Sequence, residues 1–94
     1  MANDFAIDLV ATGARIKAIR KALGLRVTDI SDYMGFTEPQ AVYKWQRGES
    51  LPTLDNMIAL AKLFNTRVED IVVLRGEERD SSPSVFYKLL ITTY

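Results

Sequence analysis

Residues 24–48 read GLRVTDISDYMGFTEPQAVYKWQRG, and three glycines divide this stretch into two short segments. In the first segment, Val27, Ile30 and Met34 fall at positions i, i+3 and i+7, a spacing that places their side chains on one face of a helix. Gly35 follows directly and can adopt the left-handed conformation that ends a helix. The pattern therefore predicts a helix over residues 27–34 that stops at a tight turn.

The second segment carries a start signal ahead of its apolar positions. Thr37 is a predicted N-cap, and it is followed by an acid, a proline and a glutamine, as is typical of a first helical turn. We expect this helix to run from Glu38 to about Gln46 and to bury Val42 and Trp45 on its inner face. The stretch thus predicts two short helices joined by a glycine turn.

The residues before this stretch predict another helix that also ends at a glycine. Between residues 12 and 23, Ile16, Ile19 and Leu23 form one apolar stripe, and Gly24 is placed to close the helix in a left-handed cap. No acidic residue interrupts the basic side chains of this region. We therefore expect an amphipathic helix with one buried face and one basic face.

Two further helices are predicted after the stretch. Thr53 is the N-cap of the first, and Asn65 is suited to the left-handed conformation that ends it. The residues expected on its buried face are Leu54, Met57, Ile58, Leu60, Ala61 and Phe64. A shorter helix is expected from Val68 to about Leu74, although its β-branched content makes a strand the competing interpretation.

The C-terminal residues divide into a polar linker and an apolar tail. Residues 75–83, RGEERDSSP, are rich in turn formers. Residues 84–94, SVFYKLLITTY, fit the period of a strand and that of a helix equally well, so periodicity leaves both open. The expected organisation is an N-terminal segment over residues 1–12, a helical domain over residues 13–74, and the linker and tail over residues 75–94.

Composition limits the classes of function. The 94 residues include neither cysteine nor histidine, which removes thiolate nucleophiles, imidazole bases and the usual zinc ligands. We therefore expect no enzymatic activity, no metal and no cofactor. The N-terminus lacks the features of a secretory signal, and no apolar run approaches the roughly 20 residues of a membrane span, so a cytoplasmic location is expected.

The net charge of zero hides an uneven distribution along the chain. Twelve basic side chains balance twelve acidic ones, a balance that does not suggest a nucleic-acid partner. However, residues 9–28 hold five basic side chains and no acidic one, a local charge of +5. The basic side chains of that block are Arg15, Lys17, Arg20, Lys21 and Arg26. A basic block of this kind is either a solvated helix face or a surface for an anionic partner.

Residues 13–73 resemble the Cro/CI-type (XRE family) helix-turn-helix domain of bacterial and phage repressors. The matching words are GARIKAIRKALGL, DISDYMGF, AVYKWQRG and SLPTLDNMIALAKLF, in this order and spacing. The resemblance implies an all-α fold, a five-helix lambda-repressor-like bundle with a short C-terminal extension. It also implies sequence-specific binding of an operator in double-stranded DNA as a small transcriptional regulator, most simply a repressor, with the helix over about residues 38–46 in the major groove.

The resemblance places the base-contacting residues in the first two turns of that helix. These are Glu38, Pro39, Gln40, Ala41 and Lys44. Their chemistry suits the task, because glutamine can pair with adenine, lysine can donate to guanine, and a carboxylate can accept from cytosine. The residues expected to contact phosphate are Arg15, Lys17, Arg20, Arg26, Thr28, Tyr43 and Arg47.

The sequence departs from the family pattern at four places. One extra residue near Pro39 leaves the register of the base-contacting residues open by one position, and Arg26-Val27 replaces the usual Thr-Gln pair. Gln46 stands where a glutamate often pairs with the arginine that matches Arg20, so a charge-assisted hydrogen bond is expected instead. Glu49 is an acidic residue in a loop that is expected to pass near phosphate.

The assembly and a second function class remain open at this point. We expect a homodimer on a palindromic site, with residues 84–94 either pairing the subunits or covering the core of their own subunit. The alternative function is a protein-interaction module or an antitoxin on the same fold, which would use the tail for a protein partner and bind DNA weakly. No membrane partner is expected.

Overall fold

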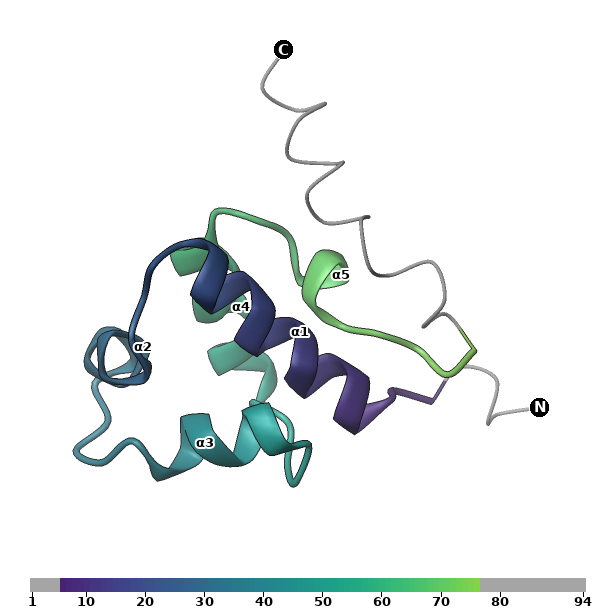
Figure 1. Ribbon diagram of the computed structural model, residues 1–94, viewed down its shortest axis with the longest axis horizontal. Helices are drawn as coiled ribbons and strands as arrows, with labels where there is room; N and C mark the ends of the chain where they lie inside the picture. The colour runs from purple at the N-terminus through teal and green to yellow at the C-terminus, as the bar shows by residue number, and fades with distance from the viewer. Residues whose placement is uncertain (1–5, 77–94) are drawn as a thin grey trace, which may run out of the picture.

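The computed structural model describes residues 6–76, which form five helices around one core (Figure 1). The helices are α1 (Leu9–Ala22), α2 (Val27–Met34), α3 (Gln40–Arg47), α4 (Leu54–Phe64) and α5 (Val68–Ile71). In Figure 1, α1 crosses the middle of the bundle, and α2 and α3 lie on one side of it. The predicted all-α, five-helix fold is confirmed. Within residues 6–76, no helix has the length and apolar character needed to cross a bilayer.

The predicted helix ends are confirmed where a local signal sets them. Gly35 and Gly48 have φ angles of 79° and 76°, so they end α2 and α3 in the left-handed conformation that glycine adopts without strain. Asn65 ends α4 with a φ angle of 56°. At the start of α4, the Thr53 hydroxyl accepts a hydrogen bond from the Asn56 N–H at 3.2 Å. These caps fix the length of the helices from a few neighbouring residues.

Three other helix ends differ from the prediction. Helix α1 begins at Leu9, earlier than the helix predicted within residues 12–23, because the Asp8 carboxylate accepts from the Ala11 N–H and caps it. Helix α3 begins at Gln40 rather than Glu38, since the ring of Pro39 disfavours a helical conformation at the residue before it. Thr37 is therefore not its N-cap. Helix α5 is a single turn that ends at Ile71, as Val72 is already extended.

The core receives at least one fully buried side chain from every helix. Ile16, Ile30, Val42, Leu60 and Ile71 are each 0% exposed, and they come from α1 to α5 in that order. The predicted burial of Val42 and Trp45 is confirmed. Three residues expected in the core are exposed instead, namely Leu23, Leu54 and Ile58.

Helices α1 and α3 approach each other so closely that their backbones touch. A Cβ atom placed on Gly13 would lie 2.2 Å from the Trp45 carbonyl oxygen and 2.8 Å from that of Gln46. Since real Cβ atoms do not come this close, only glycine fits at this crossing. The contact fixes the position of α3 against α1.

The two ends of the described chain are joined by backbone pairing. Ile7 and Leu74 form an antiparallel bridge, with the Asp8 N–H donating to the Val73 oxygen at 2.8 Å. The buried Thr12 hydroxyl strengthens this junction by accepting from the Val73 N–H at 2.9 Å. Residues 84–94, for which both a helix and a strand were open, lie outside the described residues.

Candidate nucleic-acid interface

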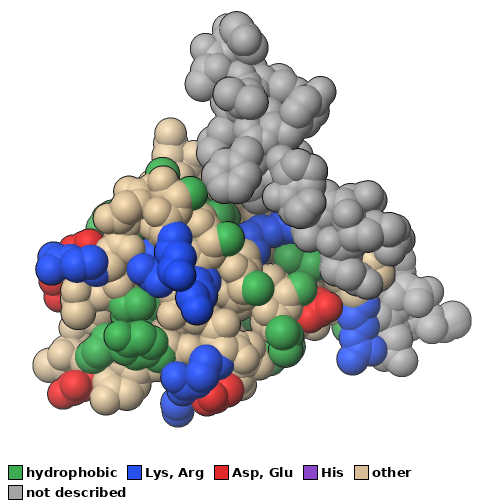
Figure 2. Space-filling view, viewed as in Figure 1, with side chains coloured by type: hydrophobic (Ala, Val, Ile, Leu, Met, Phe, Trp, Pro, Cys, Tyr) green, Lys and Arg blue, Asp and Glu red, His purple; other side chains and the backbone are tan. Residues whose placement is uncertain are grey.

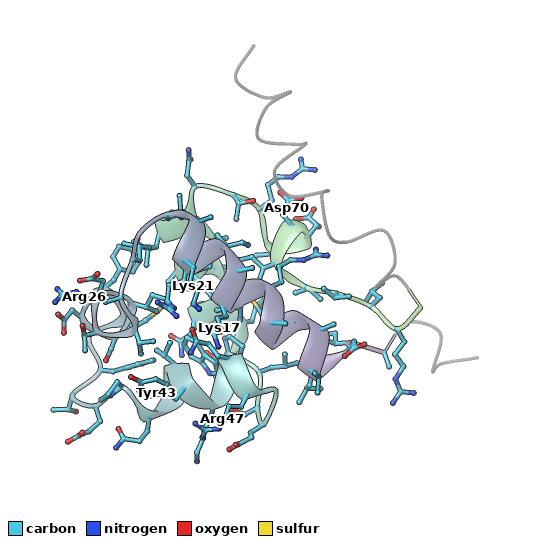
Figure 3. The ribbon with its side chains drawn as sticks, viewed as in Figure 1. Lys17, Lys21, Arg26, Tyr43, Arg47 and Asp70 are labelled. Atoms are coloured by element: carbon cyan, nitrogen blue, oxygen red, sulfur yellow. The ribbon has the colours of Figure 1, made fainter. Side chains whose placement is uncertain are left out.

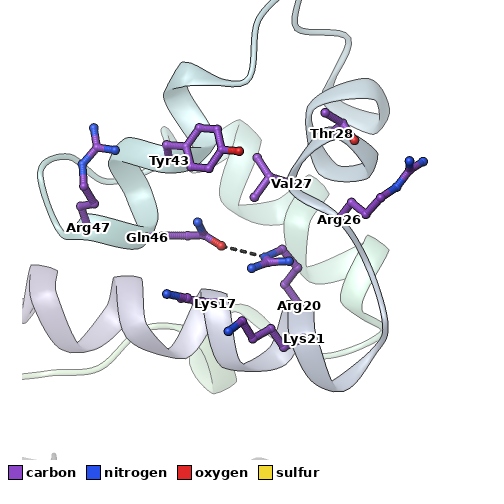
Figure 4. A pocket seen from close by; sticks show the side chains of 9 residues that line it. All are labelled: Lys17, Arg20, Lys21, Arg26, Val27, Thr28, Tyr43, Gln46 and Arg47. Carbon is purple, nitrogen blue, oxygen red and sulfur yellow. Dashed lines mark hydrogen bonds between the residues drawn. The ribbon is translucent and has the colours of Figure 1, made fainter.

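A groove of about 660 Å³ lies where α1, the start of α2 and α3 meet (Figure 4). We call it the basic groove, because five of its nine lining residues are lysine or arginine and none is acidic. The lining residues are Lys17, Arg20, Lys21, Arg26, Val27, Thr28, Tyr43, Gln46 and Arg47. Figure 2 shows that lysine and arginine side chains gather on this face, with acidic side chains at its edges.

Helix α1 contributes the lysines of the basic groove. Lys17 and Lys21 are four residues apart, which places them one above the other on the same helix face, and both are exposed. Neither lysine has an ion-pair partner among residues 6–76. Figure 3 shows both side chains projecting from α1 on the side of α3, whereas Asp70 lies on the other side of α1. The two lysines are thus available for an external anion.

Arg20 has a different role, because its guanidinium is already hydrogen-bonded inside the groove. Its Nε donates to the Gln46 side-chain oxygen at 2.8 Å, and its Nη1 donates to the Leu25 carbonyl at 2.8 Å (Figure 4). The expected charge-assisted hydrogen bond between Arg20 and Gln46 is confirmed. These bonds connect α1 to α3 and to the loop before α2, so Arg20 holds the walls of the groove together.

The start of α2 forms one end of the basic groove. The Arg26 N–H donates to the Asp29 carboxylate at 2.7 Å, and the Arg26 guanidinium contacts the same carboxylate at 3.0 Å. The side-chain and backbone hydrogen bonds from Arg26 hold the pKa of Asp29 below its ordinary value. Thr28, in the first turn of α2, also lines the groove, and Val27 turns into the core with 8% of its surface exposed.

Helix α3 forms the opposite wall. Tyr43 and Arg47, four residues apart, line the groove and are exposed. The Arg47 guanidinium forms an ion pair with Glu49, which follows the helix. The side-chain hydrogen bond from Arg47 is the main cause that lowers the pKa of Glu49, and the charge of Lys44 lowers it further. The groove therefore has an engaged arginine at each end and two lysines between them.

The outer surface of α3 carries the predicted base-contacting residues. Gln40 and Lys44 are exposed and lie four residues apart on the face away from Val42 and Trp45. Ala41 is half-buried. Glu38 and Pro39 lie in the turn before α3, where the Glu38 carbonyl accepts a hydrogen bond from the buried Ser31 hydroxyl at 3.2 Å. This set is continuous along the start of α3, next to the groove.

Six of the seven predicted phosphate contacts come together in the basic groove. The seventh, Arg15, lies elsewhere, since its guanidinium donates to the Asp70 carbonyl of the α5 turn at 3.2 Å. Lys21 lines the groove although it was not among the predicted residues. Its spacing of four residues from Lys17 is the signal that places it on the same face.

The family model for the helix-turn-helix domain matches residues 16–71. No curated protein sequence matches the chain. Among solved structures, the P22 c2 repressor in complex with synthetic operator 9T is 31% identical, with 69% of this chain and 94% of that chain covered and a TM-score of 0.60. The restriction-modification controller protein C.AhdI from Aeromonas hydrophila is 27% identical, with 66% and 92% covered and a TM-score of 0.60.

A more distant structure agrees in fold. The clp gene regulator ClgR from Corynebacterium glutamicum is 13% identical, covers 89% of this chain and 82% of its own, and has a TM-score of 0.62. The sequence words, the five-helix bundle and the matched residues 16–71, more than half of the chain, lead to the same assignment. The chain belongs to the Cro/CI-type helix-turn-helix family of DNA-binding transcription regulators.

Proposed function

We propose that this protein represses transcription by binding a specific sequence of double-stranded DNA, with α3 in the major groove. The observation that carries the proposal is the meeting of six predicted phosphate-contacting residues in one groove beside the exposed face of α3. A helix inserted in the major groove has the phosphate backbone on both sides, so a basic groove next to the reading helix meets the geometric need.

The division of roles follows from position. Gln40 and Lys44 face outward from α3 and present groups that discriminate bases, because an amide can pair with adenine and an ammonium group can donate to guanine. Lys17 and Lys21 line the groove from the neighbouring helix α1, where they offer positive charge to the phosphate backbone rather than contacts to bases. We therefore assign sequence reading to α3 and the turn before it, with Glu38, Pro39 and Ala41 as the other base contacts, and sequence-independent affinity to α1.

Two copies of the chain are needed for a selective site. Helix α3 has only eight residues, so one copy reads few base pairs, and two half-sites about one helical turn apart multiply the selectivity. We propose a homodimer in which residues 84–94 contribute to pairing. Sedimentation of the full chain and of a chain ending at residue 76 tests this, because unchanged association would remove the role of the tail.

The function is tested by selecting bound duplexes from a random pool and measuring affinity against salt concentration. We expect an enriched sequence motif, and a log–log salt slope that corresponds to several phosphate contacts. The absence of a motif together with a flat salt dependence would reject DNA binding. That result would favour the alternative function, in which the same fold binds a protein partner instead of DNA.

Single substitutions separate the two assigned roles. Gln40→Ala or Lys44→Ala should cost about 1–3 kcal/mol on the selected site and relax the preference at one base pair. Lys17→Ala should weaken binding to every duplex alike and reduce the salt slope by about one contact. Lys62→Ala, which removes an exposed lysine of α4 outside the groove, is the matched control. Equal losses from the α3 and α1 substitutions on all sequences would contradict the assignment.

A further inference from the structure

The two arginines at the ends of the basic groove are each held by a carboxylate just outside it. Arg26 contacts Asp29, and Arg47 contacts Glu49, while neither acid lines the groove. In Figure 2, two groups of basic side chains at the edge of this face have acidic side chains directly beside them. Lys17 and Lys21 have no such partner among the described residues. The arginine charges are thus already balanced within the chain.

The two acids differ in what else they do. Asp29 also accepts the backbone N–H of Arg26, so it helps to start α2. Glu49 lies in the loop after α3, and its side chain contacts only Arg47 in the hydrogen-bond and ion-pair contacts of residues 6–76. Both partners of this pair are about half exposed, and an exposed ion pair contributes little to folding. Among the contacts of residues 6–76, none therefore shows a structural task for the Glu49 carboxylate.

The geometry of the pair makes it a competitor of phosphate. Two nitrogens of the Arg47 guanidinium, Nε and Nη2, face the two oxygens of Glu49. The same two-pronged edge of a guanidinium is what binds a phosphate group. A phosphate that contacts Arg47 must displace this carboxylate or lie next to it, and like charges at that distance repel.

We propose that Glu49 is an intramolecular competitor of DNA phosphate, which occupies Arg47 in the free protein and lowers the affinity for every duplex sequence alike. The inference rests on the proposed function, because it concerns the same groove. As a consequence, the basic side chains of the groove differ in when they bind phosphate. The two lysines of α1 bind the phosphates of any duplex, and Arg47 contributes only after Glu49 has been displaced. Sequence-independent binding stays weak, so occupancy depends on the base contacts of α3.

The test compares Glu49→Gln with Glu69→Gln in the full chain. Both substitutions raise the net charge by one, but Glu69 is exposed on α5 and lies outside the groove. On a duplex of unrelated sequence at about 0.1 M salt, E49Q should bind about three- to tenfold more tightly, with a salt slope steeper by about 0.9. E69Q should change the affinity less than twofold and leave the slope unchanged.

A double-mutant cycle shows whether the gain passes through Arg47. In the wild type, Arg47→Ala should weaken binding less than twofold, because its guanidinium is occupied. In the E49Q background, the same substitution should remove the whole gain. Equal effects of R47A in the two backgrounds would overturn the inference, and so would an E49Q protein that binds no more tightly than E69Q.

The outcomes also separate this inference from the proposed function. If the wild type selects a DNA motif and E49Q gains nothing over E69Q, the competition is absent and the proposed function stands. If neither the wild type nor E49Q binds duplex DNA, the proposed function fails and the inference fails with it. Circular dichroism of each variant confirms that the bundle is intact, since Glu49 is exposed and its loss should not alter the helices.

Discussion

Replacing Gly13 with alanine should destabilise the bundle, although alanine is the better helix former. On propensity alone the change favours the helix by about 1 kcal/mol. However, the new Cβ atom would lie 2.2 Å from the Trp45 carbonyl oxygen and 2.8 Å from that of Gln46. A normal contact needs roughly 1 Å more than the shorter distance, and neither neighbour can turn away because both atoms are backbone. Helices α1 and α3 must therefore separate.

The magnitude follows from two opposing terms. Overpacking of a tight contact costs about 1–3 kcal/mol, and a backbone clash between two helices belongs at the upper end of that range. After subtracting the propensity gain, we expect a net loss of about 2 kcal/mol in the free energy of unfolding. For a domain of this size the melting temperature should fall by roughly 10 °C. DNA affinity should fall too, because Gln46 moves and its bond to Arg20 shapes the groove.

Urea unfolding followed by circular dichroism measures this loss. Ala18→Gly is the matched control, since Ala18 is exposed on the same helix and reports the propensity term without a packing change. That variant should lose about 1 kcal/mol. A Gly13→Ala protein as stable as the wild type, or more stable, would refute the argument that the backbones of α1 and α3 touch at this crossing.

Two further predictions concern the junction of the chain ends and the start of α2. Thr12→Val should lose about 1–3 kcal/mol, because the buried Val73 N–H is left without its 2.9 Å acceptor, whereas Thr12→Ser keeps the hydroxyl and should lose less. If the two variants are equally stable in urea unfolding, the hydrogen bond does not contribute. The pKa of Asp29 is lower in the folded protein than in the unfolded chain, where it is about 3.9. The ionised carboxylate therefore stabilises the fold fully above the unfolded pKa, and this stabilisation disappears as the pH falls through the folded pKa. The difference in unfolding free energy between the wild type and Asp29→Asn should therefore shrink as acid is added, and a difference that stays constant between about pH 6 and pH 2 would contradict the ion pair.

The sequence was a good guide wherever a local signal sets the structure. The helix ends at Gly35, Gly48 and Asn65 depend on the backbone conformation of one residue, and all three were predicted. The start of α1 differs from the prediction because Asp8 is its cap and the first turn that follows has no acidic residue to mark it. Leu54 and Ile58 were expected in the core, but the buried face of α4 consists of Met57, Leu60, Ala61 and Phe64, and the apolar pattern does not show where that face ends.

The arrangement of the candidate site was likewise only partly predictable from the sequence. Lys17, Thr28 and Arg47 lie far apart in the chain, and the folded bundle is what brings them to one groove. Arg15 was grouped with them by charge alone, yet its position on α1 turns it towards α5. The ion pair between Arg47 and Glu49 could not be predicted from the sequence either. Both residues are exposed, and only the geometry of the loop after α3 brings their side chains together.

The antiparallel junction between residues 7 and 74 has a consequence for engineering. The Arg75 N–H donates to the Ala6 oxygen at 2.9 Å, so the polypeptide enters and leaves the bundle at neighbouring points. A domain whose two ends lie side by side can be inserted into a surface loop of a host protein without separating the two ends of that loop. Exposed loop tips tolerate such insertions. Joining residue 76 to residue 6 through a short linker, with new ends opened at the exposed turn around Gly24, would give a circular permutant whose five helices keep their packing.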